Sequence, residues 1–386
     1  MNSVMSESNH LRSSLLLVLP VIIGLAILIF MSNFLGLAHN EEKLDELALG
    51  KETKIYRATY QGFPVHCNEI SDGKICLEGW KKRGSRPVTL WLGNSQLHAI
   101  NQMKAHDVNG VQVLFEKLAS IGNELLTFSE PNASLLEHYL LYLYLRNHVP
   151  VQTLILPVVF DDMRENGVRA GLTPALNDRI VNQELSKTVI GREILAEKKS
   201  LKSDDDLAGL NDTPQKNIEE WIVSLLTERW ALWAARPKMR GQLLKNLYLW
   251  RNSAFGINAQ SKRKIIPGRY KKNMEALGEI LRFCAIDKTN VIIYIVPLRN
   301  DVAPPYVLKE YMRFKNEIRL LAAQHAAVFV NLEGLVPGRL WGKKDATSSN
   351  GVAELDFMHF QVGGHRLLAQ ALFDLLKSNN FLSSNK

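Results

Sequence analysis

The sequence has 386 residues, of which 46% are hydrophobic and 22% are charged, a composition typical of a globular protein. A chain of this length can bury a substantial core, in one large domain or two smaller ones. Its formal net charge is +8, but the basic residues are scattered apart from those at 262–272, and no zinc-finger or RNA-binding signature accompanies them, so we expect no nucleic-acid partner.

An uncharged and apolar segment spans residues 13–37. About 20 apolar residues suffice for a helix to cross the hydrocarbon layer, whereas signal peptides have shorter apolar regions. We therefore favour a retained transmembrane anchor over a cleaved signal peptide. Arg12 precedes the segment, and basic residues stay on the cytoplasmic side. The sequence thus predicts a cytoplasmic tail over residues 1–12 and a single-pass protein of the cytoplasmic (inner) membrane, with its body on the extracytoplasmic, periplasmic side.

Residues 38–85 are expected to form a stalk that ends in a short polar segment with two cysteines. Cys67 and Cys76 flank a turn signal at Asp72-Gly73. In an oxidising compartment this arrangement favours a small disulfide-closed hairpin over two unrelated thiols. The third cysteine, Cys284, lies in an apolar helical pattern and is expected to be a buried thiol. These cysteines have no metal-ligand spacing, and we expect neither a metal nor a cofactor.

The body of the chain, over residues 86–380, alternates short apolar runs with longer helical patterns. Strand-like runs lie at 88–93, 153–160, 291–298 and 326–334, and helical patterns lie near 134–147, 271–284, 306–324 and 362–378. This alternation predicts an α/β fold with a mainly parallel sheet that helices cover on both faces. Residues 185–250 contain no convincing strand, and we interpret them as a helical insertion.

Ser95 lies on the turn that follows the first of these strands, before a helix that we expect to begin at about Gln96. Ligands of open α/β sheets bind beyond the carboxyl ends of the strands. A helix start also offers free backbone N–H groups to a developing oxyanion. The sequence therefore favours Ser95 as a nucleophile, and a serine that only caps the helix is the alternative.

Asp356 and His359 lie three residues apart on a predicted loop, directly before the last helix. A histidine activates a serine hydroxyl best when a carboxylate fixes its tautomer and stabilises the imidazolium. One short segment can thus supply both partners of Ser95. A capping aspartate next to an incidental histidine is the alternative interpretation.

Together, Gly93-Asn94-Ser95 and Asp356-Phe357-Met358-His359 resemble the SGNH/GDSL hydrolase superfamily. The resemblance covers about residues 86–380, and Gly363-Gly364 at the start of the last helix is part of its most specific piece. It implies an SGNH-like three-layer sandwich in which Ser95 is the nucleophile and His359 and Asp356 are its catalytic partners.

The chain departs from the pattern of that family at two points. Asn94 stands where the family has an aspartate, and the Gly-x-Asn-Asp block, whose Asn helps bind the oxyanion, is not intact. The equivalent strand end carries Asp161 and Asp162 instead. We expect Asn94, Asn132 and Asp161 to be candidates for oxyanion or substrate binding, and a helix cap is the alternative for Asn132.

With these departures and the expected N-terminal anchor, the chain resembles an envelope-polymer branch of the superfamily more than its simple esterases. That branch includes the D-alanyl transfer protein of teichoic acid modification and the alginate acetylation proteins. The resemblance implies transfer of an O-acyl group to or from a cell-envelope polysaccharide, with a membrane-bound O-acyltransferase as partner. Two alternatives stay open: a plain esterase on small esters, and a catalytically silent scaffold or glycan-binding domain.

Other polar residues near strand or helix ends carry weaker signals. We expect His98 to lie at the surface rather than to line the cleft, and His365 to face solvent or cap a helix. Arg164 and Arg299 follow strand ends, where they would hold an anionic substrate or form salt bridges. The basic segment 262–272 fits contact with anionic headgroups or an acidic polymer, and it fits a solvated basic face equally well.

Overall fold

The computed structural model describes residues 52–67, 73–196, 246–348 and 351–382. The expected cytoplasmic tail and anchor, residues 38–51 and 68–72 of the expected stalk, and most of the expected helical insertion lie outside these residues. Residues 189–196, inside the range expected for the insertion, are helical. No helix in the described ranges is long and apolar enough to cross a membrane. One compact unit, Ala48–Asp204 with Trp250–Lys386, contains every element discussed below.

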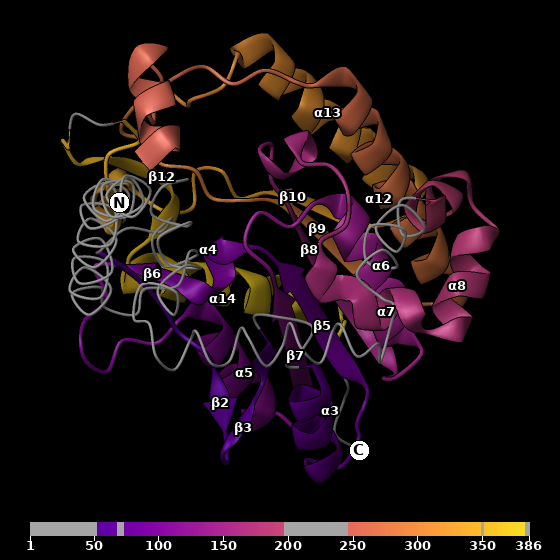
Figure 1. Cartoon of the computed structure of the whole chain (residues 1–386). Helices are drawn as coiled ribbons and strands as arrows, with labels where there is room; N and C mark the ends of the chain where they lie inside the picture. Colours follow the sequence, from indigo (N-terminus) through magenta and orange to yellow (C-terminus); the bar gives the residue numbers. More distant parts are fainter. Residues whose placement is uncertain (1–51, 68–72, 197–245, 349–350, 383–386) are drawn as a thin grey trace, which may run out of the picture. The chain divides into compact units, whose positions relative to one another are not determined.

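A six-stranded parallel sheet forms the centre of this unit (Figure 1). Its strand order is β10-β9-β8-β5-β7-β4, and every neighbouring pair is parallel. The strands are β4 (His66–Cys67), β5 (Val88–Gly93), β7 (Glu124–Ser129), β8 (Val151–Val158), β9 (Asn290–Ile295) and β10 (Val328–Asn331). The predicted α/β fold with a mainly parallel sheet is confirmed.

Helices cover both faces of the sheet. The helices α6 (Leu135–Arg146), α12 (Pro267–Asp287) and α13 (Leu308–Gln324) contribute to one hydrophobic cluster, and α5 (Gly110–Ser120) and α14 (Val362–Ser378) contribute to the other. Strand residues alternate between the two clusters, as Leu90 and Leu92 do against Trp91, because successive side chains of a strand point to opposite faces. A strand buried on both faces is apolar throughout, which explains the continuous run of β5.

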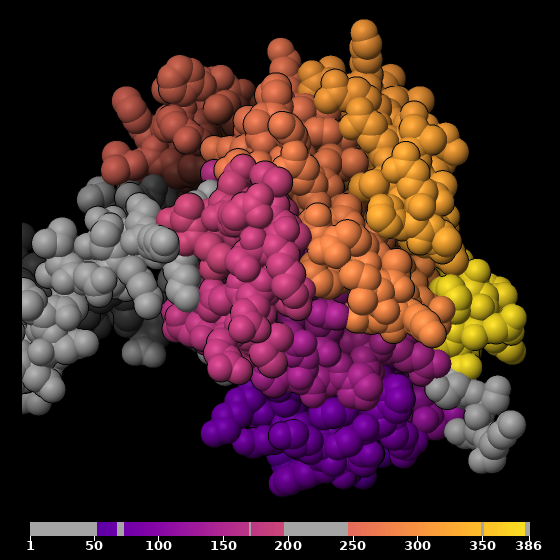
Figure 2. Space-filling view, turned by 90° about the vertical axis from the view of Figure 1, so that its right-hand side faces the viewer, coloured from indigo at the N-terminus to yellow at the C-terminus, as the bar shows by residue number. Residues whose placement is uncertain are grey.

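Two short helices extend the layer formed by α6 and α12. They are α7 (Thr173–Asn177) and α8 (Arg179–Ser186), and both contact α6. Figure 2 looks onto this side of the unit, where the pink surface of α7 and α8 adjoins the orange surface of α12 and α13.

The α/β unit begins before residue 86. Strand β1 (Thr53–Ile55) pairs antiparallel with β6 (Ala99–Asn101), and β4 extends the central sheet beside β7. Residues that we expected to form a stalk therefore build an edge of the body. The reason is that Val65 and Cys67 are apolar and completely buried or nearly so, which a stalk cannot provide.

Cys67 and Cys76 form a disulfide, but the expected hairpin is wrong. Cys76 lies on the helix α3 (Gly73–Lys82), which buries one face that includes Cys76 and Trp80. Cys76 and Trp80 lie four residues apart, which places them on the same face of a helix. The turn signal at Asp72-Gly73 led us to expect a hairpin instead of this helix. The bond therefore links the edge strand of the sheet to a helix that packs beside it.

Removing the disulfide should destabilise this edge. We expect the double variant Cys67→Ala/Cys76→Ala to lose about 2–3 kcal/mol of unfolding free energy, since the closed loop is short, with a sequence separation of nine. Urea unfolding of the oxidised protein and the variant measures the difference. Reduced wild-type protein should match the variant, and equal stability of all three forms would contradict the prediction.

The chain reverses its direction across the sheet at β5. From β5 it passes to β7 on one side, and then to β8 on the other side of β5. Open α/β sheets bind ligands at such a switch point, outside the carboxyl ends of the two strands. In this protein that position lies beyond Gly93 of β5 and Val158 of β8.

Candidate active site

Ser95 lies at this switch point, as the first residue of the single-turn helix α4 (Ser95–His98). Asn94 caps the helix, because its Oδ1 accepts the Gln96 N–H at 3.0 Å. Gly93 permits the tight entry, since a Cβ there would clash with Leu97. The longer helix expected from Gln96 is wrong, because the chain turns at once into β6, which pairs with β1.

Asp356 and His359 lie on the strand β12 (Glu354–Phe360), so the loop predicted for them is wrong. Strand β12 pairs antiparallel with β11 (Trp341–Lys344), and the register shifts between Trp341 and Lys343. Residues three apart on a regular strand point to opposite faces. The irregularity in the pairing turns the Asp356 and His359 side chains to the same side, as β-bulges do near functional sites.

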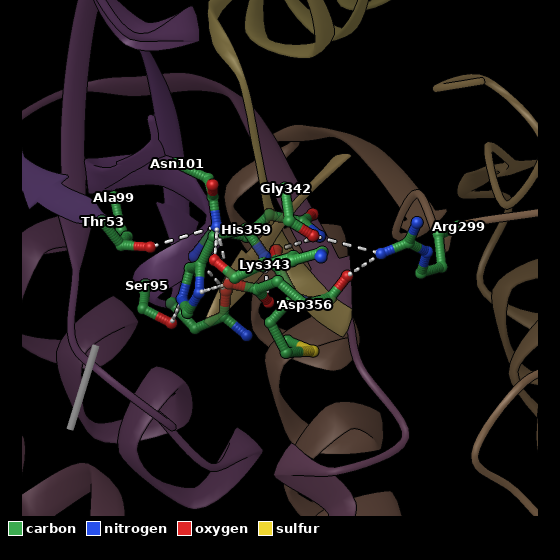
Figure 3. Close-up of polar contacts among 12 residues, drawn as sticks. Thr53, Ser95, Ala99, Asn101, Arg299, Gly342, Lys343, Asp356 and His359 are labelled. Carbon is green, nitrogen blue, oxygen red and sulfur yellow. Dashed lines mark hydrogen bonds and ion pairs between the residues drawn. The ribbon is translucent and has the colours of Figure 1, made fainter. Parts of the chain in front are cut away.

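Ser95, His359 and Asp356 form one hydrogen-bonded chain (Figure 3). Ser95 Oγ lies 3.0 Å from His359 Nε2, and His359 Nδ1 lies 3.0 Å from Asp356 Oδ2. Asp356 is buried, whereas the His359 side chain is 12% exposed. The buried Asp356 carboxylate thus bonds to one nitrogen of the partly accessible His359 ring, and the other nitrogen bonds to the Ser95 hydroxyl. This geometry allows His359 to take a proton from Ser95.

The second oxygen of Asp356 is held by the backbone. Its Oδ1 accepts the Met358 N–H at 2.8 Å and the His359 N–H at 3.0 Å. Burial by itself would raise the pKa of Asp356, but the charge of His359 and these hydrogen bonds bring that pKa below its usual value. Asp356 therefore stays ionised in the folded protein, and one of its oxygens faces His359 Nδ1.

Three polar side chains that we did not predict as site residues hold these groups in place. Asn101 of β6 donates to Asp356 Oδ2 at 3.1 Å and to the Lys343 carbonyl at 2.9 Å. Gln96, next to the serine, donates to the Met358 carbonyl at 3.0 Å. Arg299 is buried and donates to the Asp356 carbonyl at 3.3 Å. In the sequence, Gln96 is adjacent to Ser95 and Arg299 follows a strand end, whereas Asn101 carries no such signal.

The residues predicted for the oxyanion region lie in different surroundings. The Asn94 side chain is buried and donates to Asp162 Oδ2 at 2.7 Å. Asn132 is exposed with φ of 52°, in the turn after β7, and Ser134 rather than Asn132 caps α6. The Asp161 carboxylate accepts from Arg263 and from the Tyr306 hydroxyl. Asp162, which we did not select, is the carboxyl of this pair that contacts the Ser95 turn.

Two histidines expected at the surface are buried instead. His98 and His365 are each 1% exposed. His98 Nδ1 lies 2.7 Å from Ser129 Oγ, and His66 Nε2 lies 2.6 Å from the same oxygen. His365 Nε2 lies 3.2 Å from the Ala99 carbonyl. Each ring has a buried partner that is distant or unmarked in the sequence, Ser129 of β7 for His98 and the Ala99 carbonyl of β6 for His365.

Arg164 and Arg299 form salt bridges in the structure. Arg164 pairs with Asp161 at 3.4 Å and Arg299 pairs with Asp301 at 2.7 Å. The sequence allowed either binding of an anionic substrate or salt bridges, and the observed contacts are salt bridges. Within the part of the chain that is described, no group of three or more His, Cys, Asp or Glu side chains is placed to hold a metal ion.

Buried histidines should make the fold sensitive to acid. Burial lowers the pKa of His98, His138 and His365 to about 3 and that of His66 well below its ordinary value. Unfolded histidine titrates near pH 6.5, so the unfolded state binds more protons below that pH. We expect the unfolding free energy to fall between about pH 6.5 and 3, each histidine adding up to about 1.4 kcal/mol per pH unit.

Chemical denaturation at a series of pH values tests this expectation. The variant His98→Asn should flatten the acid slope, whereas His148→Asn, at an exposed position, should leave the slope unchanged. A wild-type stability that is constant from pH 7 to about 4 would contradict the prediction.

Comparison with known proteins gives structural likeness but no relative by sequence. No protein-family model and no curated protein matches the chain. The structure is similar to an aryl esterase from M. smegmatis, with 12% identity, a TM-score of 0.31, and coverage of 76% of this chain and 99% of the other. It is also similar to an alpha/beta hydrolase enzyme from the Lake Arreo metagenome, with 10% identity, a TM-score of 0.35, and coverage of 78% and 98%. An acetyl-xylooligosaccharide esterase from Geobacillus has 11% identity, a TM-score of 0.34, and coverage of 79% and 99%.

Proposed function

We propose that this protein is a serine esterase or acyltransferase in which Ser95 is the nucleophile, His359 the general base and Asp356 the residue that orients His359. The observation that carries the proposal is the hydrogen-bonded chain from Ser95 Oγ through both nitrogens of His359 to Asp356, with 3.0 Å at each step. Two segments 264 residues apart in sequence supply this chain. A helix-capping serine needs no such partners.

The chemistry follows from these contacts. His359 Nε2 takes the Ser95 proton while Ser95 Oγ bonds to the carbonyl carbon of an ester, and the carbonyl oxygen becomes an oxyanion. Collapse of this intermediate expels the alcohol, which receives the proton from His359, and leaves an acyl group on Ser95. Water or a sugar hydroxyl then accepts the acyl group in the reverse sequence. The backbone N–H of Ser95, at the start of α4, is a donor for the oxyanion.

For the substrate, we propose an O-acyl group on a cell-envelope polysaccharide, handled on the extracytoplasmic side by a body that residues 13–37 tether to the cytoplasmic membrane. A membrane-bound O-acyltransferase is the proposed partner. The disulfide between Cys67 and Cys76 supports this setting, because such bonds persist in oxidising compartments. The departures from the family's pattern, together with the expected N-terminal anchor, resemble the envelope-polymer branch and support acyl transfer.

A fluorophosphonate probe tests the nucleophile directly. We expect the purified protein to gain one probe mass, and peptide mapping to find the adduct on Ser95. A folded protein that takes up no probe would select the catalytically silent scaffold instead. Incubation with p-nitrophenyl acetate and an envelope polysaccharide then separates the two reactions: acetate on the polymer supports transfer, and free acetate alone supports the plain esterase.

A further inference from the structure

The two carboxyl groups after β8 serve different purposes. The Asp161 carboxylate accepts hydrogen bonds from Arg263 and from the Tyr306 hydroxyl. Asp162 is 5% exposed, and its Oδ2 accepts the Asn94 side-chain N–H at 2.7 Å. Because Asn94 directly precedes Ser95, Asp162 lies at the switch point between β5 and β8 beside the proposed nucleophile.

Asp162 lacks the partners that a buried carboxylate requires. Among the residues that the structure describes, no Lys, Arg or His forms an ion pair with it. Burial raises the pKa of Asp162 well above its usual value; the Asn94 hydrogen bond lowers it, and the neighbouring carboxylates raise it further. The charges of Asp161, Glu165 and Glu137 act on Asp162, and Asp162 acts on Arg169. The other groups near this turn, Arg164, Arg263 and Tyr306, bond to Asp161 instead.

The hydrogen bonds also indicate which oxygen carries the proton. Asn94 Oδ1 accepts the Gln96 N–H, so the other end of the amide, Nδ2, must be the donor to Asp162 Oδ2. When the carboxyl group is neutral, the oxygen that accepts this bond must be its carbonyl oxygen, because the O–H oxygen is the donor. The proton then belongs on Oδ1, for which the described residues provide no acceptor.

We propose that Asp162 is a further catalytic residue, whose carboxyl O–H donates a hydrogen bond to the oxyanion that forms when Ser95 attacks an ester. The inference rests on the proposed function. Asp162 keeps its proton throughout: Ser95 Oγ bonds to the carbonyl carbon, the carbonyl electron pair moves to oxygen, and His359 holds the serine proton until the alcohol leaves. A neutral acid stabilises the oxyanion, whereas an ionised carboxylate at this place would repel it.

If Asp162 donates to the oxyanion, replacing it with an amide and with an apolar side chain should change the acylation rate by different amounts. Asp162→Asn keeps a neutral donor of the same shape, and we expect its acylation rate at pH 7 to stay within about tenfold of wild type. Asp162→Ala removes the donor, and we expect a loss of about 100-fold or more at every pH, as for other single oxyanion donors. Stopped-flow acylation by p-nitrophenyl acetate measures both rates, and thermal unfolding checks that each variant is folded.

The pH profile separates a donor from a merely structural residue. The wild-type acylation rate should decline at alkaline pH as Asp162 ionises, because burial raises the pKa of this carboxyl well above its usual value. Asp162→Asn should abolish this decline, and Glu165→Gln, which changes an exposed carboxylate on the same turn, should retain it. Infrared spectroscopy at pH 7 should show a protonated carboxyl band in wild type that Asp162→Asn lacks.

The outcomes are distinct. Identical alkaline profiles for wild type and Asp162→Asn, or a folded Asp162→Ala with wild-type rates, would overturn the role of Asp162 and leave the proposed function intact. A folded wild type that no serine probe labels would overturn the proposed function, and the role of Asp162 with it. A decline that Asp162→Asn alone removes supports the donor.

Discussion

Ser95→Ala and His359→Ala should each lower ester turnover by about a million-fold, the loss that removal of a nucleophile or its base produces in serine hydrolases. The alanine at position 95 has no oxygen to bond to the acyl carbon. The alanine at position 359 leaves the Ser95 hydroxyl without the acceptor that now lies 3.0 Å away. Steady-state hydrolysis of p-nitrophenyl acetate measures both losses against the uncatalysed rate.

The double variant carries the sharper test. If Ser95 and His359 act as one unit, removing both should cost no more than removing either. Losses that multiply would contradict the shared role. The matched controls are Ser120→Ala and His148→Ala, since both residues are exposed and lie in other parts of the fold. Both controls should retain wild-type turnover.

Strands and helices with one dominant pattern were predictable from the sequence. The helix over 362–378 has the predicted bounds, because its apolar residues recur with the helical period and Gly363-Gly364 precede them. Strand β5 was predicted because it is apolar throughout. Strand β7 was missed: it contains Glu124, Thr127 and Ser129, all buried in the structure. Buried polar side chains can form their hydrogen bonds with residues that are far away in the sequence. In a single sequence such residues cannot be told from exposed loop residues.

The part of the candidate site that could be predicted is the part whose residues stand next to predicted ends of strands and helices. Ser95, Asp356 and His359 have distinct residue types at positions next to predicted element ends. Asn101 and Asp162 have no such signal, because their contacts depend on how β6 meets β12 and how the end of β8 meets the Ser95 turn. The expected surface position of His98 failed for the same reason, since its partner Ser129 belongs to the strand that was missed.

Asp356→Asn should lower turnover by about 10,000-fold, because an amide cannot satisfy all four donors that this carboxylate accepts. Two backbone N–H groups meet Oδ1, whereas His359 and Asn101 meet Oδ2. Whichever way the amide turns, its NH₂ group faces donors. With NH₂ toward His359, the imidazole proton moves to Nε2, and His359 can no longer accept the serine proton.

The pH dependence of stability gives this prediction a second measurement. The pKa of Asp356 is lower in the folded protein than in the unfolded chain, so its charge stabilises the fold above about pH 4, and this stabilisation is lost as the pH falls further. Asp356→Asn should lack that loss. Asp374→Asn, at an exposed position of α14, should keep wild-type turnover and the wild-type acid slope. Turnover of Asp356→Asn within tenfold of wild type would show that His359 needs no carboxylate, and the role of Asp356 would then be only to hold the bulge of β12 in place.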